Sequence, residues 1–193
     1  MTQAIQPKSK FTFEEYLAYD DGTDNRYELV DGELIALPPE SGKNVRIAQH
    51  LCFNLLRAGL VQLDLIHLHS CEIQVPVLQP GQSENRHPDL VVLREEHRVL
   101  TQRQLAIKHN MPAPVLVVEV VSPGKVNRER DYIEKREQYA ARSIPEYWLL
   151  DPQDQVVIVL RLDSGSYVEV GHFRGNERIL SPTFPTLDLT AGQ

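Results

Sequence analysis

The sequence predicts an α/β fold in which a mixed β-sheet is flanked by helices. Two long segments carry apolar residues at helical spacing, and several short runs rich in Val, Ile and Leu lie between and after them. The order along the chain is a hairpin, a helix, three strands, a second helix and further strands, which is typical of a sheet covered by helices. With 193 residues, 41% of them hydrophobic, we expect residues 1–193 to form one domain.

Composition argues against several classes of protein. The sequence contains no apolar run long enough to cross a membrane, and MTQAIQPKSK at its start lacks the apolar core of a signal peptide. Cys52 and Cys71 lack the spacing of metal-binding pairs, so we interpret them as reduced thiols of a cytoplasmic protein. A net charge of −7 argues against a surface that attracts nucleic acid as a whole, but it leaves room for a local basic groove.

The first part of the chain predicts a short helix, a hairpin and a long helix. Thr12 can cap a short helix whose first turn contains two glutamates. Strands are expected at 27–30 and 33–37, because Asp31-Gly32 between them supplies the positive φ of a tight turn. From about Ser41 to Leu60 apolar residues recur at helical spacing, which predicts a long amphipathic helix.

The middle of the chain has the periodicity of strands. Apolar and polar residues alternate over 71–77, and two more strands are expected at 88–93 and 114–121. The strand at 114–121 is almost wholly apolar, so we expect it at the centre of the sheet. The segments 79–86 and 94–114 look like connections, the second with a short helix at Gln102–Ile107.

The last third predicts a helix and more strands. The helix is expected over Arg128–Arg142, with Ile133 and Ala140 facing the core and the polar side turned away. Strands follow at 146–151 and 156–162. Residues 167–173 and the proline-rich tail to Leu189 are expected to add an edge hairpin and a wrapping segment.

A single acid interrupts the most apolar strand. Burying an unpaired carboxylate is costly, so Glu119 within VLVVEVV should be paired, neutralised or bound to a metal. Asp89 stands near the start of the preceding strand, and the two carboxylates converge if the strands are neighbours. Two carboxylates, a backbone carbonyl and waters are a ligand set that Mg²⁺ accepts. The alternative is that Glu119 lies at a strand end and pairs with an arginine.

Taken in order, these motifs resemble the PD-(D/E)XK nuclease superfamily and, more closely, the Uma-two family of restriction endonuclease-like proteins. The resemblance covers about residues 11–162 and rests on Tyr27–Glu33 (YELVDGE), His50 in the first long helix, Arg86–Asp89 (RHPD), Val118–Pro123 (VEVVSP), Asp131 through Lys135 to Tyr139, and Ile144–Pro152 (IPEYWLLDP). It implies a restriction endonuclease-like fold with an N-terminal β-hairpin and extra C-terminal strands. It also implies an endonuclease that hydrolyses phosphodiester bonds in DNA with Mg²⁺ or Mn²⁺.

The resemblance implies that Asp89 and Glu119 hold the metal and that a lysine completes the catalytic centre. The superfamily pattern places this lysine two residues after the acid, where this sequence has Val121. Lys135 on the following helix is therefore the candidate, as in related families. The alternative is an exposed helical lysine paired with Asp131, four residues earlier.

Two more residues are expected in the catalytic centre. Glu28 looks like the additional N-terminal acid of such sites, although it also fits the solvent face of a strand. His50 belongs to a basic stripe on the first long helix, which either meets phosphates near the metal or is simply solvated. Lys125 and Gln74 are weaker candidates.

Two other functions remain open. The acidic net charge and the displaced lysine also fit a catalytically silent nucleic-acid-binding or regulatory module on the same fold. His67-Leu-His69-Ser-Cys-Glu72 resembles the metal motif of cupins, but it lacks their flanking glycines, and the two long helices argue against an all-β fold. By analogy with enzymes that cut both strands of DNA, we expect a homodimer.

Overall fold

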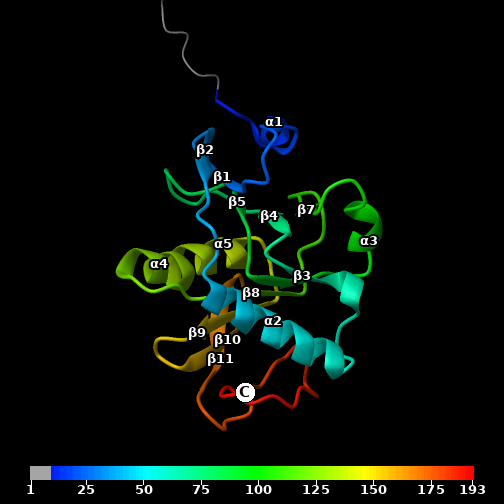
Figure 1. The fold of residues 1–193 in the computed structure, drawn as a ribbon, viewed down its shortest axis with the longest axis vertical. Coiled ribbons are helices and arrows are strands. Elements are labelled where there is room, and N and C mark those ends of the chain that lie inside the picture. Colours follow the sequence, from blue (N-terminus) through cyan, green and yellow to red (C-terminus); the bar gives the residue numbers. More distant parts are fainter. Residues whose placement is uncertain (1–9) are drawn as a thin grey trace, which may run out of the picture.

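The computed structural model describes residues 10–193. At its centre lies a six-stranded mixed sheet in the order β11-β10-β9-β8-β6-β3 (Figure 1). In this sheet β8 (Leu116–Val120) and β9 (Glu146–Asp151) run parallel, and all other neighbouring strands are antiparallel. All five residues of β8 are buried. The expected central position of this apolar strand is thus confirmed.

The remaining strands divide among three sheets. The six-stranded sheet also contains β3 (Ile66–Leu68), β6 (Leu90–Val92), β10 (Val156–Asp163) and β11 (Ser166–Phe173). A three-stranded sheet has the order β5 (Asn85–Arg86), β4 (Glu72–Gln74) and β7 (Ala106–Ile107), and the expected hairpin is formed by β1 (Tyr27–Val30) and β2 (Glu33–Ala36). The strands predicted at 71–77, 88–93 and 114–121 are present but shorter, as β4, β6 and β8.

The helices are few and mostly short. Thr12 and Glu15 form a reciprocal capping box at α1 (Phe13–Leu17), and Ser41 caps the long helix α2 (Gly42–Arg57). The others are a 3₁₀ turn η1 (Leu63–Leu65), α3 (His97–Leu100), α4 (Lys125–Glu129), a π-helical turn η2 (Arg130–Glu134) and α5 (Lys135–Ala141). None of the helices in the described part of the chain has the length and apolar character needed to cross a bilayer.

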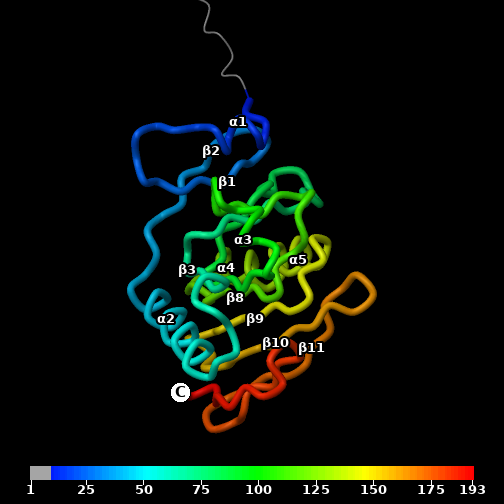
Figure 2. Tube along the Cα trace, turned by 90° about the vertical axis from the view of Figure 1, so that its right-hand side faces the viewer, coloured from blue at the N-terminus to red at the C-terminus, as the bar shows by residue number. Residues whose placement is uncertain are grey.

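Two apolar layers cover the two faces of the six-stranded sheet. Ala48 and Leu55 of α2 pack on one face, together with Ile179 and Leu187 of the C-terminal segment. Tyr139 of α5 and the three-stranded sheet pack on the other. The C-terminal segment lies at the end of the molecule opposite to α1 and the β1–β2 hairpin (Figure 2). Alternate residues of β8 therefore face different layers, which decides where Glu119 points.

The prediction of a helix at Gln102–Ile107 is wrong. The short helix of this connection is α3, which lies earlier, and Ala106–Ile107 forms β7 instead. Both β7 residues are buried, and they pair in parallel with Glu72 and Ile73 of β4. Pairing with a strand that is distant in sequence overrides the local helical pattern here.

The orientation predicted for the second long helix is also wrong. Ile133 is 53% exposed, whereas Asp131, Lys135 and Tyr139 are buried, although Ala140 does face the core as expected. The helical segment is divided by η2, in which the backbone N–H of Lys135 donates to the carbonyl of Arg130, five residues earlier. Its charged side is the buried one, because those side chains bind one another. Hydrophobic periodicity alone cannot reveal such an arrangement.

Candidate active site

The ends of three neighbouring strands bring His69, Asp89 and Glu119 into one row across the sheet. Leu90 of β6 pairs with Leu68 of β3 on one side and with Val118 of β8 on the other, and these two residues immediately precede His69 and Glu119. Continued by one residue, these registers place Asp89 between His69 and Glu119. The backbone N–H of His69 donates to the carbonyl of Asp89 at 3.2 Å, as this register requires. Opposite residues on one face of a sheet have Cβ atoms about 5 Å apart, so these side chains can act together.

A cavity of about 300 Å³ opens beside this row. Its lining is dominated by charged groups: the carboxylates of Glu28, Glu40, Asp89, Glu119 and Asp131, and the cations of Arg130 and Lys135. The walls also include Pro38, Pro39, His87 and Asn127. A cavity with this lining suits a charged, polar ligand.

Glu119 is buried and held by two donors. Its Oε2 lies 2.7 Å from Nζ of Lys135, and the hydroxyl of Tyr139 donates to Oε1 at 2.6 Å. Burial raises the pKa of Glu119, the Lys135 ammonium opposes this, and Asp89 and Asp131 add to the rise, which brings the pKa to about 7. The cation that pairs with Glu119 is thus a lysine and not the arginine of the alternative interpretation.

Lys135 lies between two carboxylates. Its ammonium is 2.7 Å from Glu119 and 2.9 Å from Asp131, and only 8% of its side chain is exposed. Burial alone would lower the pKa of Lys135, but the two carboxylates raise it above its ordinary value, so the group stays charged. The π-helical turn η2 ends immediately before this residue, and such turns are frequent at functional sites. The alternative of an exposed lysine is wrong, although the predicted pairing with Asp131 is present.

The two oxygens of the Asp89 carboxylate have different surroundings. Its Oδ2 accepts the backbone N–H of Val120 at 2.6 Å, which ties the start of β6 to β8. Its Oδ1 lies 3.2 Å from Nδ1 of His69. The structure thus brings the two acids named from the sequence, Asp89 and Glu119, to one cavity together with Lys135.

Glu40, His69 and Asp89 form the only cluster of three metal-type ligands within residues 10–193. One donor atom from each lies within 4.8 Å of the other two. Both ring nitrogens of His69 are buried and make no hydrogen bond within residues 10–193, although Nδ1 lies 3.2 Å from Oδ1 of Asp89. Two carboxylates and an imidazole are a donor set that binds divalent cations. The residues at this edge of the sheet therefore fit a metal ion.

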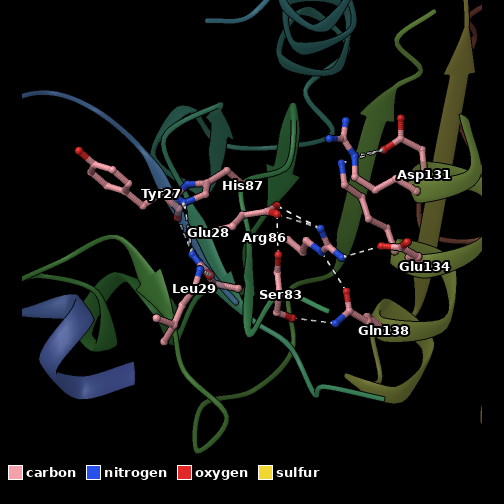
Figure 3. A network of polar contacts seen from close by, with 12 residues as sticks. Tyr27, Glu28, Leu29, Ser83, Arg86, His87, Asp131, Glu134 and Gln138 are labelled. Atoms are coloured by element: carbon pink, nitrogen blue, oxygen red, sulfur yellow. Dashed lines mark hydrogen bonds and ion pairs between the residues drawn. The ribbon is translucent and has the colours of Figure 1, made fainter. Parts of the chain in front are cut away.

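Glu28 lines the cavity, but both of its oxygens are engaged. Arg86 donates to the two oxygens at 3.1 Å each, and the Ser83 hydroxyl donates at 2.6 Å. Burial would raise the pKa of Glu28, but Arg86 and Ser83 bring it below its ordinary value. Arg86 also donates to Gln138 and Glu134, so it links the hairpin to the helix that carries Lys135 (Figure 3).

His87 is a neutral imidazole at the same cavity. Burial lowers its pKa to about 4. Its Nε2 lies 3.1 Å from the backbone carbonyl of Tyr27, so we assign the proton to Nε2. Its Nδ1 is buried and has no hydrogen-bond partner among the described residues. Sequence reasoning included His87 in a motif but gave it no role.

Arg130 contributes a guanidinium that is held only by a long ion-pair contact within residues 10–193. Its side chain is 34% exposed and lines the cavity. Its Nε lies 3.6 Å from Asp131, and the guanidinium makes no hydrogen bond within the described part of the chain. An arginine in this state can bind a phosphate in bidentate fashion. Its position beside an acidic cavity could not be predicted, because it depends on the π-helical turn.

Three residues named from the sequence lie elsewhere. His50 is exposed on α2 and lines a separate cavity of about 540 Å³ with Lys43 and Arg46. Lys125 is exposed and lies 3.6 Å from Glu129, and Gln74 accepts the backbone N–H of His109. The structure therefore does not bring His50, Lys125 or Gln74 to the carboxylates.

The mixed sheet with packed helices excludes the all-β cupin fold. Of the two histidines in the motif that suggested it, His69 instead joins the cluster at Asp89, and His67 lies in β3. The signal for His69 was present in the sequence. What the sequence did not show was the strand register that places it beside Asp89.

Comparison with known proteins identifies the fold and the family. The structure is similar to the crystal structure of "a putative nuclease belonging to DUF820 from Anabaena variabilis ATCC 29413", with a TM-score of 0.62, 19% sequence identity, and coverage of 94% of this chain and 95% of that one. At this identity the likeness shows the fold alone, and it confirms the expected α/β fold. No curated protein matches the chain. The family model of Uma2, described as "Putative restriction endonuclease", matches residues 13–192, and the chain therefore belongs to the Uma2 family.

Proposed function

We propose that this protein is a metal-dependent endonuclease that hydrolyses phosphodiester bonds in DNA, with its reaction centre at Asp89, Glu119 and Lys135. One observation carries the proposal. The buried, charged Lys135 contacts Glu119, which lies beside Asp89 on the neighbouring strand, and all three residues line one cavity. The description of the family and the name of the similar structure both support a nuclease.

Asp89 and Glu119 are the proposed ligands of the catalytic cation. Each carboxylate oxygen has lone pairs beyond those used by its present donors, so both acids can still bind a metal. An all-oxygen pair completed by water suits Mg²⁺ or Mn²⁺. When bound, such a cation supplies positive charge for the scissile phosphate and favours ionisation of a water nucleophile.

Lys135 would act as a charged hydrogen-bond donor. Its two carboxylate neighbours, at 2.7 and 2.9 Å, keep the ammonium protonated and fix its position. Such a group orients the attacking water and stabilises the negative charge that develops on the phosphate in the transition state. Glu28 would help indirectly, because Arg86 connects it to the helix of Lys135.

Two further groups would contact the substrate. The guanidinium of Arg130, whose Nε lies 3.6 Å from Asp131, is the proposed ligand of the non-bridging phosphate oxygens. His50 would contact the DNA backbone away from the reacting phosphate, together with Lys43 and Arg46, since these three exposed groups form no ion pair within residues 10–193. A homodimer would offer one centre to each DNA strand.

The test is cleavage of supercoiled plasmid with Mg²⁺ or Mn²⁺, with single-stranded DNA and RNA as parallel substrates. We expect wild type and the exposed control Glu33→Gln to cut DNA, and Asp89→Asn and Glu119→Gln to lose roughly 100-fold or more in rate. Cleavage by Asp89→Asn and Glu119→Gln at the rate of wild type would contradict the assignment. Metal binding without cleavage of any substrate would favour the catalytically silent module on the same fold.

A further inference from the structure

We infer that Glu40, His69 and Asp89 form a second cation position beside the proposed reaction centre, and that it takes a divalent transition metal such as Mn²⁺ or Zn²⁺. Asp89 is common to both positions, so the second one extends the proposed function. Glu40 and His69 take no part in the proposed Asp89–Glu119 pair. The two positions can therefore be tested separately.

The three ligands come from separate segments that meet at one edge of the sheet. Glu40 lies in the loop before α2, His69 directly follows β3, and Asp89 directly precedes β6. Their donor atoms all lie within 4.8 Å of one another. Donors on a common ion lie about 3–4 Å apart, because each metal bond is about 2.1 Å long. Small side-chain rotations would therefore bring all three to one ion.

The hydrogen bonding of these three side chains is incomplete, and this supports a bound ion. Within the described part of the chain, both imidazole nitrogens of His69 are buried without a hydrogen-bond partner, which is uncommon for buried polar atoms. The backbone N–H of Val120 occupies Oδ2 of Asp89, and Oδ1 is left facing the imidazole at 3.2 Å. The nearest partner of Glu40 is Arg26, at 3.4 Å. A cation would give the imidazole a partner and would use the remaining lone pairs of the two carboxylates.

The backbone is also arranged to present His69. Its φ of 54° lies in the left-handed region, which residues other than glycine rarely adopt and which is often found at functional sites. Arg26 holds this conformation by donating to the carbonyl of His69 at 2.9 Å, and the same guanidinium contacts Glu40. One arginine therefore fixes the relative placement of two of the three ligands.

The ligand chemistry sets the class of cation. An imidazole nitrogen favours transition metals over Mg²⁺ and Ca²⁺, which prefer oxygen. The side chain of Glu40 is 29% exposed, so the cluster reaches solvent through this ligand. The Asp89–Glu119 pair offers only carboxylate oxygen, so the two positions should differ in the metal that they prefer.

The experiment is pulsed electron paramagnetic resonance on the full chain loaded with Mn²⁺, which detects the nuclear coupling of a coordinated histidine nitrogen. We expect this coupling in wild type, in Glu119→Gln and in the control His67→Ala, which removes the other histidine of the same motif. We expect it to vanish in His69→Ala. Calorimetry should show Zn²⁺ affinity at least ~10-fold lower in His69→Ala and in Glu40→Gln, a loop variant that leaves the sheet intact.

The outcomes separate this inference from the proposed function. Absence of nitrogen coupling in Mn²⁺-loaded wild type, or coupling that persists in His69→Ala, would overturn the second position. Plasmid cleavage with Mg²⁺ would still stand in that case. Nitrogen coupling in a wild-type protein that cuts no nucleic acid would support the second cation position and contradict the proposed nuclease activity.

Discussion

The ammonium group of Lys135 lies 2.7 Å from the carboxylate of Glu119, and both side chains are almost completely withdrawn from solvent. The pair joins the helix that follows η2 to the central strand of the sheet, and the Tyr139 hydroxyl, one helical turn later, reinforces the same contact. A buried ion pair adds little net stability over an apolar pair, but losing one partner leaves an uncompensated charge. Two residues proposed for chemistry are therefore also linked in folding.

Replacing Lys135 tests this linkage. We expect Lys135→Met to lower the free energy of unfolding by about 3–5 kcal/mol, because Glu119 and Asp131 then lose their shared cation. Urea denaturation would measure the loss. The matched control is Lys125→Met, because the side chain of Lys125 is 87% exposed and its only ion pair within residues 10–193 is with Glu129 on the surface. A Lys135→Met protein as stable as that control would show that the buried carboxylates do not depend on the lysine.

The two carboxylates of the proposed centre should differ in which metals they affect. We expect Asp89→Ala to abolish binding of both Mg²⁺ and Zn²⁺, because Asp89 belongs to both proposed positions. Glu119→Ala should abolish Mg²⁺ binding and keep Zn²⁺ binding. Calorimetry on each variant measures both affinities, with circular dichroism to confirm folding. Unchanged Mg²⁺ affinity in both variants would refute the Asp89–Glu119 assignment.

Replacing Arg130 should weaken the binding of DNA, because its guanidinium is proposed to contact the phosphate. We expect Arg130→Ala to raise KM for DNA about tenfold with a smaller change in kcat, since a phosphate contact is made in both the ground state and the transition state. Arg130→Lys should restore part of the affinity. Arg161→Ala serves as control, because Arg161 is more than half exposed and its ion-pair contact with Asp163 is as long as 4.0 Å. A loss confined to kcat would instead indicate that Arg130 acts only in the transition state.

Sequence reasoning found the elements that local patterns control and missed what depends on long-range register. The apolar run around Glu119 marked both the central strand and its exceptional acid, because a carboxylate among valines has few stable environments. Ile133 misled the prediction of the buried helix face, because the charged residues on the other side satisfy one another inside the protein. Glu40 carried no signal at all, since only the fold brings its loop to His69.

The buried carboxyl group of Glu72, which lies outside the proposed centre, should make the stability of the protein depend on pH. Burial raises its pKa from 4.5 to about 7, although hydrogen bonds from Tyr16 and Asn85 oppose the rise. The folded state thus holds a proton that the unfolded state releases near pH 4.5. Between about pH 4.5 and 7 the unfolded chain binds fewer protons, so stability falls as pH rises. The loss from this group amounts to about 3 kcal/mol by pH 8.

Glu72→Gln removes this dependence while keeping the oxygen that accepts from Asn85 at 2.6 Å. We expect the stability of the variant relative to wild type to increase by about 3 kcal/mol between pH 4.5 and pH 8, measured by urea denaturation at each pH. Other titrating groups cancel in this difference, because they are the same in both proteins. The exposed control Glu33→Gln should show no such trend. A difference between Glu72→Gln and wild type that stays constant with pH would mean that Glu72 is already ionised in the folded protein near pH 5. The two hydrogen bonds to its carboxylate would then balance the cost of burying its charge.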